Sequence, residues 1–61
     1  MPIITVEALP GRTTEQKRGL VKDMTDAVTK NFKCEPEAVT IIIHEISEEH
    51  LAKAGKLRID W

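Results

Sequence analysis

Residues 3–9 alternate between an apolar face and a mixed face, and they are rich in residues that favour β-strands. This period of two predicts a strand from Ile3 to Leu9. Pro10-Gly11 follows at once, and a Pro-Gly pair is typical of a turn. The apolar face of the predicted strand contains Ile4, Val6 and Ala8, and the opposite face contains Ile3, Thr5 and Glu7.

The period of the apolar residues then changes to that of a helix. Thr13-Thr14-Glu15-Gln16 has the capping-box pattern, in which the side chains of Thr13 and Gln16 each accept from the other's backbone N–H. We therefore expect a helix from about residue 14 to residue 32. Its apolar stripe consists of Leu20, Val21, Met24, Ala27, Val28 and Phe32.

The predicted loop after this helix runs from Lys33 to Pro36, because proline prevents the helix from continuing. A second strand is expected from Ala38 to Glu45. After it, Ser47-Glu48-Glu49 indicates a short helical turn. The segment from Ala52 to Trp61 has Gly55 between short β-prone pieces, which favours a small hairpin or strand.

Strand, helix and strand in this order form a βαβ unit, with parallel strands and a right-handed crossover. The sequence thus predicts an α/β (α+β) fold, with residues 1–61 as one domain. One helix covers only one face of a two-stranded sheet, and the uncovered face contains Ile3 and Ile42. Since the strand edges are open as well, we expect another chain to cover them.

The size of the chain leads to the same expectation. A chain of 61 residues buries only about 60% of its unfolded surface, which is marginal for a domain that folds alone. The single cysteine, Cys34, excludes an intrachain disulfide, and together with His44 and His50 it lacks the paired spacing of a structural zinc site. Oligomerisation remains as the expected support.

The charges exclude several classes of function. Nine basic and ten acidic residues give a net charge of -1, which argues against nucleic-acid and polybasic membrane partners. The longest apolar run, Ile41-Ile42-Ile43, is too short to span a bilayer. Met1-Pro2-Ile3-Ile4 does not resemble a signal peptide. We therefore expect a cytoplasmic protein.

The candidate chemistry centres on Pro2. Removal of Met1 would leave proline as the first residue, and its nitrogen would then be a secondary amine. An apolar pocket with cations nearby lowers the pKa of an amine, so that it can act as a general base near neutral pH. The plainer interpretation is that Pro2 begins an edge strand, where a missing N–H has no cost. With Met1 retained, the nitrogen is an amide and cannot act as a base.

The opening Pro2-Ile3-Ile4 and the stretch Leu9-Pro10-Gly11-Arg12-Thr13, followed by Glu15-Gln16-Lys17, resemble the 4-oxalocrotonate tautomerase family. That family begins with proline and a β-strand and has Gly-Arg-(Ser/Thr)-x-Glu-Gln-Lys at the helix entrance. The likeness continues through residues 39–45 and 50–56 and covers essentially the whole chain without a gap.

The resemblance implies a protomer that dimerises into a four-stranded sheet with two helices on one face. Three such dimers would form a homohexamer, with the dimer alone as the other assembly. Pro2 would move a proton in a 2-oxo acid or its dienol, such as a 2-hydroxymuconate-like or enolpyruvate-like compound. Arg12 would bind the substrate carboxylate, often from a neighbouring subunit, and Leu9 would line the pocket. No metal or organic cofactor is implied.

Two positions depart from the family's best-studied members. Thr40 stands where they have a second arginine that polarises the substrate's carbonyl, and a hydroxyl supplies a hydrogen bond but no charge. Leu51 stands where they have a phenylalanine, so the site keeps its hydrophobicity but not the ring shape. Thr40 and Leu51 are both expected to line the pocket, and the two changes bear on the choice of substrate.

Other residues have plainer interpretations. Arg58 supplies the missing cation only if the tail folds over a neighbour's pocket, and otherwise it is a solvated or interface charge. His44 is interpreted as an interface group, and Trp61 is expected to pack against another subunit. Lys53 stands about where related dehalogenases and hydratases have a water-activating carboxylate, which disfavours hydration chemistry. The alternative function is a non-catalytic assembly module of the same fold.

Overall fold

The structure is a computed structural model that describes residues 1–61. Its first half contains strand β1 (Ile3–Ala8), helix α1 (Thr14–Phe32) and, after a 3₁₀ turn (Pro36–Ala38), strand β2 (Thr40–Glu45). A second 3₁₀ turn (Glu48–His50), strands β3 (Ala52–Lys53) and β4 (Lys56–Leu57) and a third turn (Arg58–Asp60) follow. Strands β1 and β2 pair in parallel, from Ile3 opposite Thr40 to Ala8 opposite Glu45. The predicted α+β fold with a small C-terminal hairpin is confirmed.

Helix α1 has the predicted bounds, because both of its ends are determined locally. The Thr13 hydroxyl accepts from the backbone N–H of Gln16 at 3.1 Å, and the Gln16 side chain accepts from that of Thr13 at 2.9 Å. These two bonds satisfy donors that the first turn of a helix leaves without partners. At the other end, Lys33 takes the left-handed conformation (φ 55°, ψ 51°), which terminates the helix.

Two of the predicted strand boundaries are wrong. The second strand begins at Thr40 and not at Ala38, because Pro36–Ala38 form a 3₁₀ turn before it. Helix α1 has already ended at Phe32 when the chain reaches Pro36, which opens this turn, where the N–H that proline lacks has no intrahelical partner to lose. The first strand ends at Ala8, so Leu9 already belongs to the loop that leads to α1.

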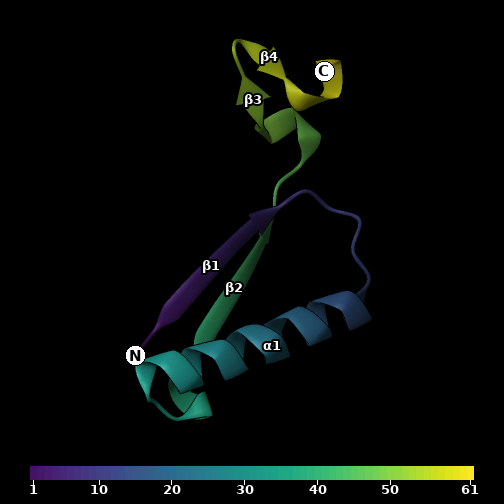
Figure 1. Ribbon diagram of the computed structural model, residues 1–61. Coiled ribbons are helices and arrows are strands. Elements are labelled where there is room, and N and C mark those ends of the chain that lie inside the picture. The colour runs from purple at the N-terminus through teal and green to yellow at the C-terminus, as the bar shows by residue number, and fades with distance from the viewer.

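Helix α1 lies along one face of the β1–β2 pair, and the other face is uncovered (Figure 1). Along β1, half-buried residues alternate with exposed ones as the sequence predicts. On the uncovered face, Ile3 is 61% exposed and Ile42 is 49% exposed. The uncovered face of the sheet thus contains two large aliphatic side chains among its polar ones.

The apolar stripe of α1 is only partly used within the chain. Val21, Met24 and Val28 are half-buried against the strands, whereas Leu20 and Phe32 are 41% and 68% exposed. Strands in a sheet lie about 5 Å apart, so a pair of strands is too narrow to cover the full width of the stripe. Leu20 and Phe32 are about 120° apart around the helix, on opposite sides of these half-buried residues, so each leaves an apolar edge of α1 uncovered.

The chain has no fully buried residue, apolar or polar. Its accessible surface is 4935 Å², whereas a compact protein of 6.9 kDa has about 4,000 Å². Its radius of gyration is 14.8 Å, against about 10–11 Å for a compact domain of this length. Both numbers describe an elongated protomer without a closed core, as is typical of a subunit that neighbours complete.

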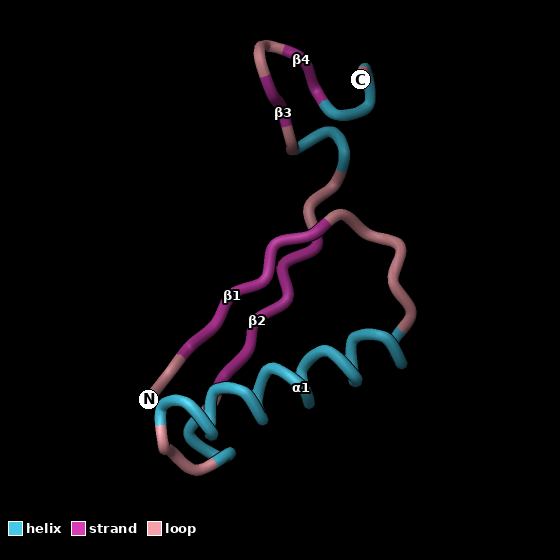
Figure 2. Tube along the Cα trace, in the orientation of Figure 1, coloured by secondary structure: helices cyan, strands magenta, loops and turns pink.

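The C-terminal segment lies beyond the carboxyl ends of β1 and β2, away from α1 (Figures 1 and 2). Strands β3 and β4 form an antiparallel hairpin whose two turn residues, Ala54 and Gly55, have positive φ angles of 52° and 83°. The backbone N–H of Arg58 donates to the carbonyl of Leu51 at 2.7 Å and closes the segment on itself. None of the helices combines the length and apolar character needed to cross a membrane.

Candidate active site

Pro2 and Thr40 meet at one end of the strand pair. The backbone N–H of Thr40 donates to the carbonyl of Pro2 at 3.0 Å, and both residues are half-buried. Pro2 directly precedes β1, and Thr40 is the first residue of β2, so the parallel register brings them together. The candidate base and the residue that replaces the family's second arginine are therefore neighbours.

An apolar hollow of about 310 Å³ lies at the opposite end of the same strands. Leu9 and Leu51, both predicted to line the site, form part of its wall. Such a volume is at the lower end of the range for small-molecule sites. The hollow is lined by Glu7, Ala8, Leu9, Ile46 and Leu51, of which all but Glu7 are apolar.

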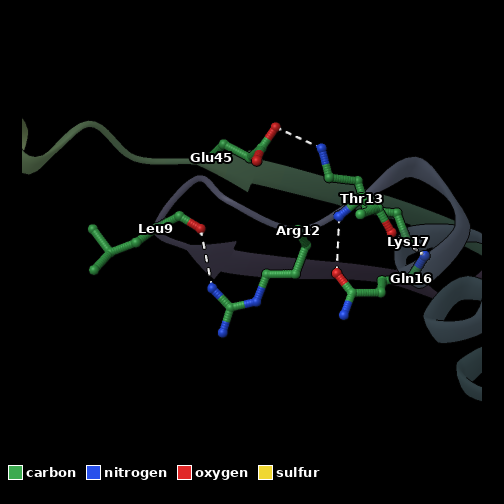
Figure 3. Close-up of polar contacts among 6 residues, drawn as sticks. All are labelled: Leu9, Arg12, Thr13, Gln16, Lys17 and Glu45. Atoms are coloured by element: carbon green, nitrogen blue, oxygen red, sulfur yellow. Dashed lines mark hydrogen bonds and ion pairs between the residues drawn. The ribbon is translucent and has the colours of Figure 1, made fainter.

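Arg12 lies in the loop that leads from β1 to α1, next to this hollow. One Nη1 group of its guanidinium donates to the carbonyl of Leu9 at 3.4 Å, a long and therefore weak hydrogen bond (Figure 3). Arg12 is exposed and has no carboxylate partner. Since a guanidinium presents five N–H donors in one plane, most of the fork is free to bind a carboxylate.

One backbone conformation and two sets of contacts hold this loop in place. Gly11 adopts φ 127°, a conformation that residues with a Cβ rarely take, and so permits the turn before Arg12. The capping box then fixes Thr13 at the helix start. Farther along the first turns of α1, the Lys17 ammonium donates to Glu45 of β2 at 2.7 Å, which joins the helix to the end of the sheet (Figure 3).

The charges around the hollow are unevenly partnered. Glu7 lines the hollow and lies 3.4 Å from the Nδ1 of His44 on the neighbouring strand. Glu45, at the end of β2, is paired with Lys17. Arg12 has no ion-pair partner, and neither have Glu48 and Glu49 in the turn between Ile46 and Leu51, so this end of the protomer has unpaired charges of both signs.

Within one chain, Pro2 and the hollow lie at opposite ends of the strand pair. Strand β1 has six residues, which places Pro2 about 20 Å from the hollow, since a strand rises about 3.3 Å per residue. The five predicted site residues thus fall into two groups, Pro2 with Thr40 and Leu9 with Arg12 and Leu51. A site that contains both groups requires more than one chain.

Three residues of the hollow were not among the predicted site residues. Glu7 and Ala8 precede Leu9 in the chain, and Ile46 directly follows β2. The signal for Ile46 is the topology itself, because the carboxyl ends of two parallel strands meet at the same edge. The backbone N–H of Ile46 indeed donates to the carbonyl of Ala8 at 2.8 Å.

The fold is that of a small α+β protein with an exposed arginine beside an apolar hollow. A family model described as tautomerase enzyme matches residues 2–58. The chain therefore belongs to the tautomerase family, as the resemblance predicts.

Relatives and solved structures agree with this assignment. The chain is 45% identical over 56 residues to the 2-hydroxymuconate tautomerase of Bacillus subtilis, covering 92% of this chain and 90% of that protein. It is 43% identical over 56 residues to a probable tautomerase of Halalkalibacterium halodurans, covering 92% of each. The crystal structure of YwhB, a homologue of 4-oxalocrotonate tautomerase, superposes with a TM-score of 0.91 at 42% identity, covering 98% of each chain.

Proposed function

We propose that this protein is a tautomerase of 2-oxo acids and their dienols, with 2-hydroxymuconate-like or enolpyruvate-like substrates. Residues 1–61 act as one domain, and removal of Met1 frees the nitrogen of Pro2 as the general base. We place the reaction in the cytoplasm, where the thiol of Cys34 stays reduced. The substrate class rests on the family membership, on Arg12 as a free carboxylate ligand and on the name of the Bacillus subtilis relative.

The proposed reaction moves a proton to a carbon of the conjugated system. The lone pair of Pro2 takes the proton from the carbon next to the carbonyl of a 2-oxo acid, or from the 2-hydroxyl group of a dienol, and the bonding electrons that remain form a dienolate. The resulting ammonium returns the same proton to a carbon farther along. Arg12 holds the carboxylate of the substrate, and the Thr40 hydroxyl donates one hydrogen bond to the developing negative charge. The apolar wall formed by Leu9 and Leu51 disfavours the charged form of the amine.

The observation that carries this proposal is the division of the site into two groups at opposite ends of one strand pair. Pro2 needs an apolar pocket and a carboxylate ligand, and its own chain offers neither at its end of the sheet. The hollow with Arg12 offers both but is far from the Pro2 of its own chain. In a symmetric oligomer, each chain can supply Pro2 to one neighbour and the hollow to another, so the two ends complement each other. We propose a homohexamer built of three dimers, or a dimer, as that assembly.

The direct test is ketonisation of a dienol by protein with a free Pro2. Intact mass spectrometry first establishes that Met1 has been removed. We expect the processed protein to ketonise 2-hydroxymuconate and the Pro2→Ala variant to lose about 10²–10⁴-fold in kcat, the usual contribution of a general base. A Pro2→Ala variant with unchanged kcat overturns the role of Pro2. Circular dichroism of both proteins is the control for folding.

The second candidate is a non-catalytic assembly module of the same fold. It is favoured by Thr40, since a hydroxyl supplies no positive charge where the best-studied members of the family have an arginine. This candidate predicts that protein with Pro2 free assembles normally and yet ketonises neither a 2-hydroxymuconate-like nor an enolpyruvate-like substrate. The tautomerase proposal predicts turnover of at least one of them.

A further inference from the structure

The side chain of Arg58 stacks on Trp61 within the C-terminal segment. Its guanidinium carbon is 4.8 Å from the centroid of the Trp61 ring, a cation–π distance. The indole N–H of Trp61 donates to the carbonyl of Lys56 at 3.2 Å, which fixes the ring. The guanidinium therefore rests on an aromatic surface that is itself held in place by the backbone of β4.

The N–H groups of Arg58 have no acceptor in the chain. Stacking uses the face of a guanidinium and leaves the donors in its plane free. No carboxylate lies within ion-pair distance of Arg58, although the residue is half-buried. A polar side chain with several donors is normally hydrogen-bonded when water is partly excluded. By contrast, Arg18, on the exposed surface of α1, is paired with Glu15.

The backbone places Arg58 beside the apolar hollow. Its N–H donates to the carbonyl of Leu51 at 2.7 Å, and Leu51 lines the hollow. Arg12 is bonded to the other leucine of the wall, but through its side chain, since its guanidinium donates to the carbonyl of Leu9. The two leucines of the wall are thus each bonded to an arginine that lacks a carboxylate partner. Of the carboxylates of the strand pair, Glu45 is paired with Lys17, and Glu7 lies 3.4 Å from the Nδ1 of His44.

We propose that Arg58 determines substrate specificity by binding the second carboxylate of a dicarboxylate, while Arg12 binds the first. This inference rests on the proposed function and adds to it a residue that distinguishes dicarboxylate dienols from monocarboxylate ones. Thr40 supplies no positive charge at its end of the sheet. In this proposal, Arg58 supplies a positive charge at the opposite end, from the C-terminal segment. The alternative to substrate binding is that the guanidinium of Arg58 forms an ion pair with a carboxylate of a neighbouring chain.

The experiment compares two dienols that differ by one carboxylate. We expect Arg58→Gln to lower kcat/KM for 2-hydroxymuconate by about tenfold to a hundredfold, the usual effect of losing a hydrogen bond between charged groups, chiefly through KM. For 2-hydroxypenta-2,4-dienoate, which has one carboxylate, kcat/KM should stay within about twofold, since Arg12 remains. Arg58→Lys keeps the charge and loses the fork, so its effect should be intermediate. Arg18→Gln is the matched control and should change neither substrate.

Two outcomes overturn the inference. An equal loss on both substrates means that Arg58 acts through the assembly, as an ion pair between chains would. No loss on either substrate means that Arg58 does not contact the acid. Only a selective loss on the dicarboxylate supports the assignment.

Binding of unreactive acids separates this inference from the proposed function. Muconate has two carboxylates and sorbate has one, and neither has the 2-hydroxyl group on which the reaction depends. Calorimetry should show that Arg58→Gln weakens muconate binding about tenfold or more and leaves sorbate binding unchanged. If the protein ketonises no dienol but this selectivity is present, the proposed function fails and the role of Arg58 stands. If muconate and sorbate are affected alike, the role of Arg58 fails whatever the protein catalyses.

Discussion

The backbone N–H of Thr40 donates to the carbonyl of Pro2 at 3.0 Å and holds the first residues of the chain against the start of β2. This bond uses the carbonyl of Pro2 and leaves its nitrogen unused. Removal of Met1 therefore breaks no hydrogen bond of the sheet, and Met1 itself is 87% exposed. The fold is thus compatible with a free amine at Pro2, held at a fixed position by the strand that follows it.

The nearness of Thr40 to Pro2 leads to a prediction about charge. A Thr40→Arg substitution places a cation at the same end of the sheet as the proposed base. We expect kcat/KM for a 2-oxo acid or its dienol to rise by about tenfold, because a positive charge stabilises the developing dienolate better than a hydroxyl does. Steady-state kinetics measure this, with Thr40→Gln as a control that adds length without charge. An unchanged or lower rate in Thr40→Arg, relative to Thr40→Gln, contradicts the prediction.

The pH dependence of the reaction follows from the protonation state of Pro2. Only the neutral amine accepts a proton, so kcat/KM should rise with pH and reach a plateau once the ammonium has lost its proton. The profile of ketonisation, corrected for the spontaneous reaction, measures this. Protein made by chemical synthesis with Met1 retained has an amide at Pro2 and should be inactive at every pH. A rate that only falls as the pH rises means that the reaction requires a protonated group, and it contradicts a neutral amine as the base.

The uncovered face of the sheet should be buried between chains. Ile42 lies on that face and is 49% exposed in the protomer. Ile42→Asp would place an unpaired carboxylate in the interface, where burial of a charge is costly. We expect this variant to sediment as a single chain and to lose helical circular dichroism, because the protomer has no fully buried residue of its own.

Thr14→Asp is the control for the added charge in the Ile42→Asp experiment. It also introduces an acidic residue, but at the exposed first position of α1, where a negative charge is favourable. Its assembly should match that of the unchanged protein. An Ile42→Asp variant that assembles normally shows that this face stays uncovered in solution.

Local patterns predict α1 well and the site only in part. The capping box and the period of 3.6 residues are confined to the helix and its cap, so its bounds, Thr14–Phe32, could be read from the sequence. The composition of the hollow depends on register, since Ile46 reaches Ala8 only when β1 and β2 pair in parallel. The support of Arg58 by Trp61 depends on how the C-terminal segment folds back, which no local pattern encodes.

The end of α1 gives a prediction about stability. Lys33 has φ 55°, a left-handed conformation that costs an L-residue about 1–2 kcal/mol and glycine almost nothing. Glycine in turn loses more backbone entropy, so we expect Lys33→Gly to raise the free energy of unfolding by about 0.5–1 kcal/mol. Lys30→Gly, inside the last turn of α1, should lower it by about 1 kcal/mol.

Denaturant unfolding at one fixed protein concentration measures the two glycine variants, since the stability of an oligomer depends on concentration. The prediction is contradicted if Lys33→Gly lowers the free energy of unfolding as much as Lys30→Gly does. It would mean that the left-handed conformation at Lys33 does not limit the stability of the helix end.

In the proposed site, Pro2 of one chain works with Arg12 of another. Pro2→Ala and Arg12→Ala chains, each inactive when refolded alone, are mixed in equal amounts, unfolded and refolded together, and assayed for ketonisation of 2-hydroxymuconate. Random assembly gives about one site in four both an intact Pro2 and an intact Arg12 from different chains. We predict about a quarter of the unchanged protein's activity in the mixture. A mixture as inactive as its two components would show that both residues of a site come from the same chain, which contradicts the shared site.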